Sequence, residues 1–173
     1  MYSELFEKEV RETAEPLLAG MGISLVELSI GRVKGVTRVS VVIHRKESVP
    51  QVRGGQMPQV RGGVGIDDCA EVSRLLLPRL QTVEGLQEVS LEVSSPGIER
   101  TIRSPAEYEI FLGRGVRILA GNETEWIVGI IDRVEEGALW LKKGREKRGF
   151  ALAEIRKARL DYSVEVEEAK NAV

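Results

Sequence analysis

The chain has 173 residues, with 25 Lys and Arg against 27 Asp and Glu, and a formal net charge of −2. A hydrophobic fraction of 42% and a charged fraction of 30% are typical of one ordinary globular domain or two small ones, and argue against disorder as the main state. No apolar run approaches the roughly 20 residues that cross a bilayer. The mixed, acidic start MYSELFEKEVRE is unlike a signal peptide, so we expect a cytoplasmic protein without a membrane partner.

The scarcity of cysteine and histidine argues against enzymatic chemistry. One Cys and one His cannot build a disulfide framework within one chain or a structural zinc site. His44 lies in a strand-like run without a nucleophile elbow, and no phosphate-binding glycine loop occurs. We interpret the adjacent Asp67 and Asp68 as helix-capping groups rather than metal ligands or acid/base groups. The prediction is no catalytic residue, no metal, no cofactor and no small-molecule substrate.

Residues 1–94 are predicted to form an α+β domain. Apolar residues at three- and four-residue spacing indicate helices over 3–20, which contains Pro16, and over 66–80, where Cys69 shares the apolar face. Alternating apolar residues indicate strands over 23–31, 36–45 and 88–93, the first two forming an antiparallel hairpin. We therefore expect a three-stranded sheet with two helices on one face.

A tandem duplication interrupts this domain. The segment PQVRGG occurs at 50–55 and again at 58–63. Its glycine pairs and low apolar content predict a flexible surface loop over 47–65. We interpret it as a tolerated insertion, with direct RNA contact as the alternative.

The remainder is predicted as a connection, a small barrel and a tail. A Ser-Pro-Gly turn and a short helix beginning near Pro105 occupy 95–112. Short strands are expected over 116–120, 126–134, 138–142, 149–151 and 159–162, with a helical turn in 152–158. They suggest an all-β SH3-like (Sm-like) barrel over 113–163. The acidic tail, 164–173, is expected to be frayed.

Basic residues concentrate between Lys142 and Arg159. Eight of them stand against Glu146 and Glu154, a local charge of +6. Such a cluster favours contact with RNA phosphates, with a solvated surface as the alternative. We interpret Trp126 and Trp140 as packing residues rather than base-stacking ones.

Three separated motifs resemble the ribosome maturation factor RimP family. They are GVGIDDCAEVSRLL (63–76), LEVSSPGIERTIRSPAEY (91–108) and LAEIRKARL (152–160). The resemblance implies a bacterial, cytoplasmic, non-enzymatic assembly factor with an N-terminal α/β domain and a C-terminal SH3-like barrel. It further implies binding to the free small (30S) ribosomal subunit, through a small-subunit ribosomal protein and rRNA, and promotion of its late maturation.

Two features depart from the family pattern. The family usually has Thr or Ser where this chain has Gly65, three positions before Asp68. Glycine replaces a capping side chain at a cost of only a few tenths of a kcal/mol, so the helix should persist. The second departure is the PQVRGG duplication, because the family usually keeps this loop short.

Two groups of residues are expected to make contacts. The ribosome-binding patch comprises Lys142, Lys143, Arg145, Lys147, Arg148, Arg156, Lys157 and Arg159. The inter-domain turn, which either orients the domains or touches the subunit, comprises Ser94, Ser95, Pro96, Gly97, Arg100 and Arg103. The alternative function is an SH3-like-barrel adaptor that binds a peptide of a single protein partner. Steep salt dependence would distinguish phosphate docking from an apolar peptide groove. We expect a monomer.

Overall fold

The computed structural model describes residues 4–45, 63–86, 88–97 and 99–171. The described residues before Gly97 form one compact unit, and those from Gly97 onward form a second. We call them the N-terminal and C-terminal units. The boundary falls within the Ser-Pro-Gly turn. Of the loop predicted over 47–65, including the duplication, only residues 63–65 are described.

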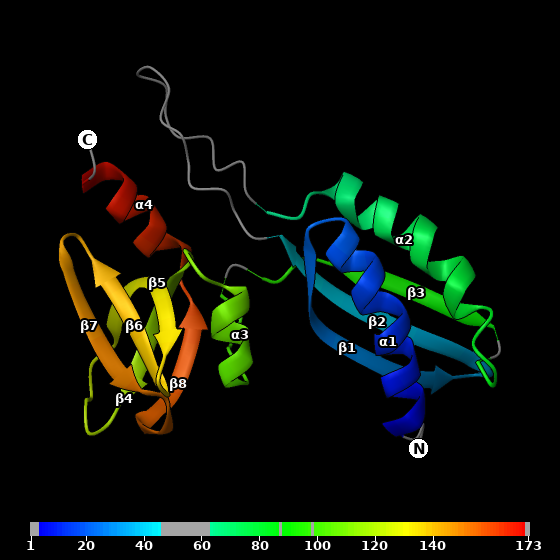
Figure 1. The fold of residues 1–173 in the computed structure, drawn as a ribbon, viewed down its shortest axis with the longest axis horizontal. Coiled ribbons are helices and arrows are strands. Elements are labelled where there is room, and N and C mark those ends of the chain that lie inside the picture. The colour runs from blue at the N-terminus through cyan, green and yellow to red at the C-terminus, as the bar shows by residue number, and fades with distance from the viewer. Residues whose placement is uncertain (1–3, 46–62, 87, 98, 172–173) are drawn as a thin grey trace. The chain divides into compact units, whose positions relative to one another are not determined.

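The N-terminal unit is a three-stranded sheet covered by two helices (Figure 1). Its elements are α1 (Glu4–Gly20), β1 (Ile23–Val33), β2 (Val36–Arg45), α2 (Ile66–Leu80) and β3 (Val89–Ser94). The strand order is β1-β2-β3, with β1 antiparallel and β3 parallel to β2. A parallel neighbour requires a crossover connection, and α2 lies within it. Pro16 is accommodated inside α1.

Apolar periodicity explains this packing. Both helices contribute residues three or four positions apart, and β2 contributes alternate residues, to one buried cluster that includes Val10, Ala14, Leu18, Val39, Val41, Ile43, Val72, Leu76 and Leu80. The β1–β2 turn places Lys34 and Gly35 at positive φ, as a two-residue type I′ turn requires. The predicted helix over 66–80 and the predicted hairpin are confirmed, and both hairpin strands face the helices with their apolar sides.

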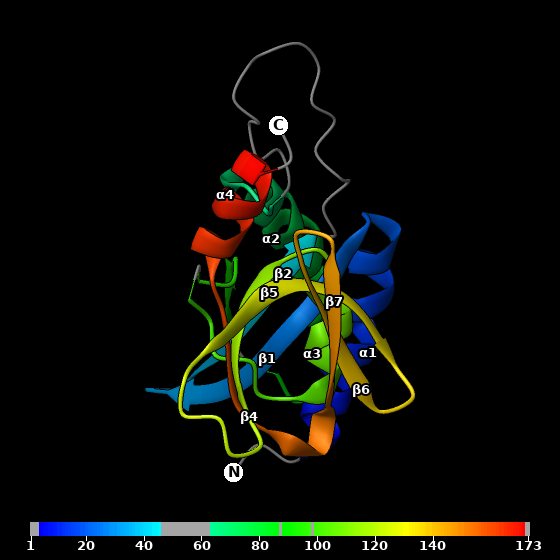
Figure 2. The ribbon, with the colours of Figure 1, turned by 90° about the vertical axis from the view of Figure 1, so that its left-hand side faces the viewer.

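The C-terminal unit contains a five-stranded antiparallel sheet. Its elements are α3 (Pro105–Ile110), β4 (Gly115–Ala120), β5 (Ile127–Glu135), β6 (Ala138–Lys143), β7 (Glu146–Ala151), the 3₁₀ turn η1 (Leu152–Glu154), β8 (Ile155–Leu160) and α4 (Tyr162–Asn171). The strand order is β7-β6-β5-β4-β8, and Figure 2 shows β7 and β6 joined as a hairpin. Within the described part of the chain no ladder joins β7 to β8. The molecule is therefore of mixed α+β class, and a closed SH3-like barrel stays a prediction.

The last strand begins earlier than predicted. Only Leu152–Glu154 is helical, and β8 then runs beside β4, pairing Ile155 with Ala120 and Leu160 with Val116. The alternation that marks this strand is short. Ala158 and Leu160 point into the core, while Arg156, Lys157 and Arg159 obscure the pattern. The prediction of a strand over 159–162 was wrong for this reason.

The acidic tail is not frayed along its described length. It forms α4, in which Val164 is buried. The Glu165 carboxylate accepts hydrogen bonds from Arg114 Nε (2.7 Å) and from the backbone N–H of Gly115 (2.9 Å). Side chains predicted to form a solvated tail are thus anchored to the start of β4. No helix in the described residues is long and apolar enough to span a membrane.

Candidate functional site

The turn between β6 and β7 carries the densest group of cations in the C-terminal unit. We call Lys142, Lys143, Arg145, Lys147 and Arg148 the basic hairpin; all five are exposed. The turn is tight, with Lys143 paired to Glu146 across the strands and Gly144 at positive φ. Among the described residues, Lys142, Lys143 and Arg145 have no ion-pair partner. These three charges are available to an external anion.

The other two cations of the basic hairpin are engaged internally. Lys147 Nζ donates to both carboxylate oxygens of Asp132 on β5, at 2.9 and 3.0 Å. This hydrogen bond is the main reason why the pKa of Asp132 lies below its ordinary value, with burial acting in the opposite direction. The guanidinium of Arg148 lies 5.0 Å from the centre of the Phe150 ring. The Lys147–Asp132 bond is not visible in the sequence, because it joins β7 to β5, whereas Arg148 and Phe150 are near neighbours on β7.

Helix α4 supports the hairpin turn from behind. The backbone N–H of Gly144 lies 2.9 Å from both carboxylate oxygens of Glu168. Glu168 therefore holds the turn between Lys143 and Arg145, and Figure 1 shows α4 and this turn at the same end of the sheet. Sequence reasoning missed this role because it treated α4 as a frayed tail. The three unpaired cations are presented on a tethered turn.

The predicted patch is split by the strand order. Arg156, Lys157 and Arg159 lie on β8, separated from β6 by β5 and β4. Arg156 Nη2 donates to the backbone carbonyl of Glu123 at 2.5 Å. Lys157 is exposed, whereas Arg159 is half-buried. The eight predicted residues thus form two groups on different strands.

The residues predicted around the Ser-Pro-Gly turn are divided between the two units. Ser94 ends β3, and Ser95 and Pro96 follow it, whereas Gly97 begins the C-terminal unit. Beyond it, the 100–102 segment runs beside β8: Leu160 N–H donates to the Arg100 carbonyl (2.8 Å) and Ile102 N–H to the Ala158 carbonyl (3.0 Å).

Arg100 also forms a secluded ion pair. Its Nε lies 3.0 Å from Glu107 Oε2, with side-chain exposures of 11% and 7%. The backbone N–H of Arg103 donates to Glu107 Oε1 at 3.2 Å. Arg100 is therefore a structural residue of the C-terminal unit. A role of Arg103 in contact with a partner stays a prediction.

Asp68 caps α2. Its Oδ2 accepts the N–H of Gly65 (2.9 Å) and its Oδ1 accepts Arg45 Nη2 (2.7 Å). The Gly65 bond lowers the pKa of Asp68 most, burial opposes it, and Arg45 lowers it further. The carboxylate half of a capping box thus persists although Gly65 has no side chain to offer. Within the described ranges no three Cys, His, Asp or Glu side chains gather as a metal site.

The two tryptophans differ in their surroundings. A Cβ at Gly149 would lie 3.1 Å from the Trp140 ring, so this indole packs closely against the β7 backbone. Arg133 lies over it, 4.6 Å from the ring centre. Trp126 is 40% exposed, and the guanidinium of Arg117 lies 5.4 Å from its ring centre. The packing interpretation fits Trp140 and does not fit Trp126.

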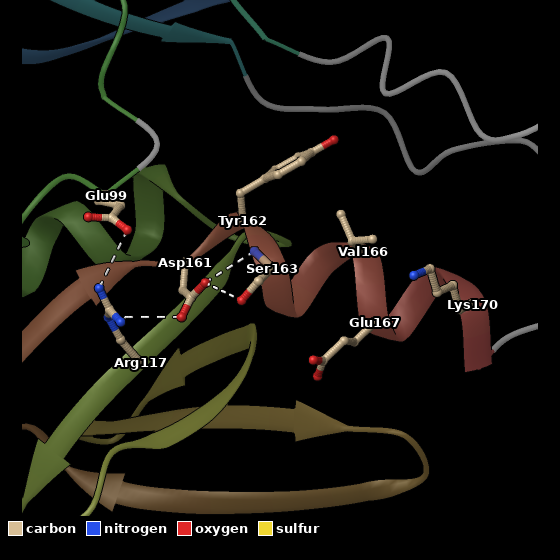
Figure 3. Close-up of a pocket in the computed structure, with 8 residues that line it drawn as sticks. All are labelled: Glu99, Arg117, Asp161, Tyr162, Ser163, Val166, Glu167 and Lys170. Carbon is tan, nitrogen blue, oxygen red and sulfur yellow. Dashed lines mark hydrogen bonds and ion pairs between the residues drawn. The ribbon is translucent and has the colours of Figure 1, made fainter.

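A hollow of about 600 Å³ lies beside β4 and α4. Figure 3 shows Arg117 between Glu99 and Asp161, at 3.7 and 3.9 Å, with Tyr162 pointing away from it. Asp161 Oδ1 also accepts the N–H (3.1 Å) and the hydroxyl (2.6 Å) of Ser163 at the start of α4. Glu99, Arg117 and Asp161 form ion pairs here, as in a structural junction.

Comparison with known protein families gives a specific match. The model of the RimP N-terminal domain matches residues 13–99. The matched range is half of the chain, and it contains part of α1, all of β1, β2, α2 and β3, and the Ser-Pro-Gly turn. Members of this family are ribosome assembly factors. The chain therefore belongs to the ribosome maturation factor RimP family.

Proposed function

We propose that this protein binds the free small ribosomal subunit and promotes its late maturation, using the basic hairpin to dock on rRNA phosphates. Family membership supports a role in ribosome maturation in general. The observation that carries the finer proposal is the exposure of Lys142, Lys143 and Arg145, which have no ion-pair partner among the described residues. When such cations neutralise phosphates, counterions are released from the nucleic acid. This release supplies affinity that does not depend on the base sequence.

The geometry of the turn favours this use of its charge. Glu168 fixes Gly144 from α4, and β6 and β7 are paired along their length from Ala138–Ala151 to Lys143–Glu146. A turn held in this way loses little conformational freedom on binding, which lowers the entropic cost of docking. The basic hairpin is therefore better suited to docking on one fixed target surface than to coating a flexible RNA strand.

The proposed mechanism is differential affinity without covalent chemistry. A factor of this kind favours one conformer of the immature subunit only to the extent that it binds that conformer more tightly. Release follows when the mature surface no longer accommodates it. In this proposal the protein is a cytoplasmic monomer, and its five-stranded sheet is the framework of an SH3-like barrel.

Co-sedimentation tests the proposal. The purified protein is mixed with free small subunits, free large subunits and joined ribosomes at low and moderate salt. A variant with all five basic-hairpin residues changed to Glu is run in parallel, after circular dichroism has shown that it is folded. We expect salt-sensitive binding to free small subunits that the variant loses. Absence of binding to any particle would contradict the proposal and leave the single-partner adaptor as the better explanation.

A further inference from the structure

The sheet of the C-terminal unit has a second surface with a character unlike the basic hairpin. It is the outer face of β5, β4 and β8, where side chains alternate with those of the core. Arg117 on β4 pairs with Val128 on β5 and with Arg159 on β8, and Leu119 pairs with Lys157. Trp126 directly precedes β5, at the level of Leu119. The outer face therefore has two adjoining rows of side chains. One row is Val128, Arg117 and Arg159, and the other is Trp126, Leu119 and Lys157.

The two sides of this face differ in their neighbouring carboxylates. Arg117 contacts the Trp126 ring and is flanked by Glu99 and Asp161. Lys157 is exposed, and within the described residues it has no ion pair. The buried Nε atoms of Arg159 and Arg117 both make no hydrogen bond in the described part of the chain, so the two sides differ in their ion pairs. The β8 side consequently attracts an anion, while Trp126 offers an apolar plane beside it.

We propose that this face binds one nucleotide of single-stranded RNA, with the base stacked on Trp126 and a neighbouring phosphate at Lys157 and Arg159. Stacking on an aromatic ring is tolerant of sequence because every base has a π-face, and flanking cations supply the backbone contact. A paired base within a duplex cannot offer that face. Glu123 and Glu125 precede Trp126 in the chain, so the phosphate is expected on the β8 side.

The proposal goes beyond docking through the basic hairpin, because it assigns a different surface and a different kind of RNA. Trp140 provides the internal contrast. Both rings have an arginine over them, Arg133 on Trp140 and Arg117 on Trp126. The Trp140 ring also packs against the Gly149 backbone, whereas the Trp126 residue is 40% exposed. Of the two tryptophans, Trp126 is the one placed to receive a base.

The proposal is tested by binding of a labelled oligouridine. A length of roughly eight nucleotides lies within the range of small single-strand sites. We expect the single strand to bind with quenching of tryptophan emission, and the same sequence in a duplex to bind more weakly. Trp126→Leu should weaken single-strand binding about tenfold, a loss typical of one stacked base. Trp126→Phe should retain binding and lose the quenching. Lys157→Gln should reduce the salt slope by about 0.7.

Equal affinity of Trp126→Leu and the unchanged protein for the single strand would overturn the proposal, as would a preference for the duplex. The assay contains no ribosomal particle and leaves the basic hairpin intact. Its failure therefore leaves small-subunit docking untouched. Conversely, if the basic-hairpin variant loses binding to the particle while oligouridine still quenches its tryptophan emission, the Trp126 proposal stands.

Discussion

The two units of the molecule differ in their most secluded ion pairs, although the C-terminal unit also has exposed ones such as Arg133–Glu135. In the N-terminal unit the helical ion pairs Lys8–Glu12 and Arg11–Glu15 lie on the surface, with side chains at least 40% exposed. In the C-terminal unit the pairs Arg100–Glu107 and Arg114–Glu165 have side chains at most 14% exposed. Exposed pairs contribute little to stability, whereas breaking a secluded pair leaves a desolvated charge. A count of charges along the chain therefore says little about which ones are free to meet a partner.

The difference follows from how each unit is built. Two long amphipathic helices cover one face of the N-terminal sheet, so apolar burial organises that unit. In the C-terminal unit the short helix α3 and the acidic helix α4 offer few apolar side chains. Glu107 ties the start of α3 to the 100–103 segment, and Glu165 ties α4 to the start of β4. In this unit carboxylates therefore add to the apolar contacts that hold α3 and α4 in place.

Breaking a secluded pair should give the largest effect. Glu107→Ala removes the acceptor of both the Arg100 guanidinium and the Arg103 N–H, and so takes the nearest carboxylate away from a secluded cation. We expect the free energy of unfolding of the C-terminal unit to fall by about 3 kcal/mol, measured by urea denaturation. The matched variant Glu12→Ala breaks an exposed pair and should cost less than about 0.5 kcal/mol. Equal losses in both variants would remove the distinction between the units.

A glycine in each unit sharpens the same contrast. A Cβ at Gly115 would clash with the Asp161 carbonyl oxygen and lie 3.1 Å from Glu165 Cγ, whereas Gly31 on β1 has nothing within 4 Å. Gly115→Ala should therefore displace α4 and lower the free energy of unfolding by about 1–3 kcal/mol. Gly31→Ala should change it by less than about 0.5 kcal/mol. Thermal unfolding of both variants measures the difference, and a harmless Gly115→Ala would mean that α4 is not seated on β4.

The capping carboxylate of the N-terminal unit predicts a pH dependence. The pKa of Asp68 is lowered in the folded state, so its stabilisation is present above the ordinary carboxyl pKa and is lost as pH falls through the lowered value. Asp68→Ala should cost about 1 kcal/mol at neutral pH. The difference in unfolding free energy between this variant and the unchanged protein should shrink below about pH 4. Asp67→Ala is the control and should cost less at neutral pH, because it is Asp68 that accepts the Gly65 N–H. A difference between Asp68→Ala and the unchanged protein that stays constant down to acidic pH would contradict the capping account.

The smallest predicted effect concerns the engaged lysine of the basic hairpin. Asp132→Asn should release Lys147 for an external phosphate and so strengthen binding to free small subunits. The logarithmic salt slope should become steeper by about 0.9 if one further phosphate is neutralised. Glu135→Gln also removes an acid from β5, but its carboxylate pairs with Arg133 and not with Lys147, so it should change the slope less. Identical slopes in the two variants would show that Lys147 takes no part.

Local patterns predicted much of this molecule, and long-range pairing accounts for most of what they missed. The spacing of Val72, Leu76 and Leu80 sufficed for α2, because helix periodicity is a property of neighbours in sequence. The separation of Arg156 from Lys142 was not predictable, because it depends on β8 pairing with β4. The helical state of the tail was missed because Glu165 and Glu168 find their partners far away in sequence.

The central claim is that the basic hairpin docks on the small subunit, and a comparison of two hairpins tests it most directly. The β1–β2 hairpin of the N-terminal unit also carries three exposed cations, Arg32, Lys34 and Arg38, which within the described residues have no ion pair. Two triple variants are compared, each with three Gln substitutions: one at Lys142, Lys143 and Arg145, the other at Arg32, Lys34 and Arg38. The measurement is the salt dependence of binding to free small subunits.

We expect the first variant to reduce the logarithmic salt slope by about 3, roughly 0.9 for each phosphate that is no longer neutralised, and the second to leave it nearly unchanged. The opposite result, a slope reduced only in the N-terminal triple variant, would contradict docking through the basic hairpin and assign the binding surface to the N-terminal unit.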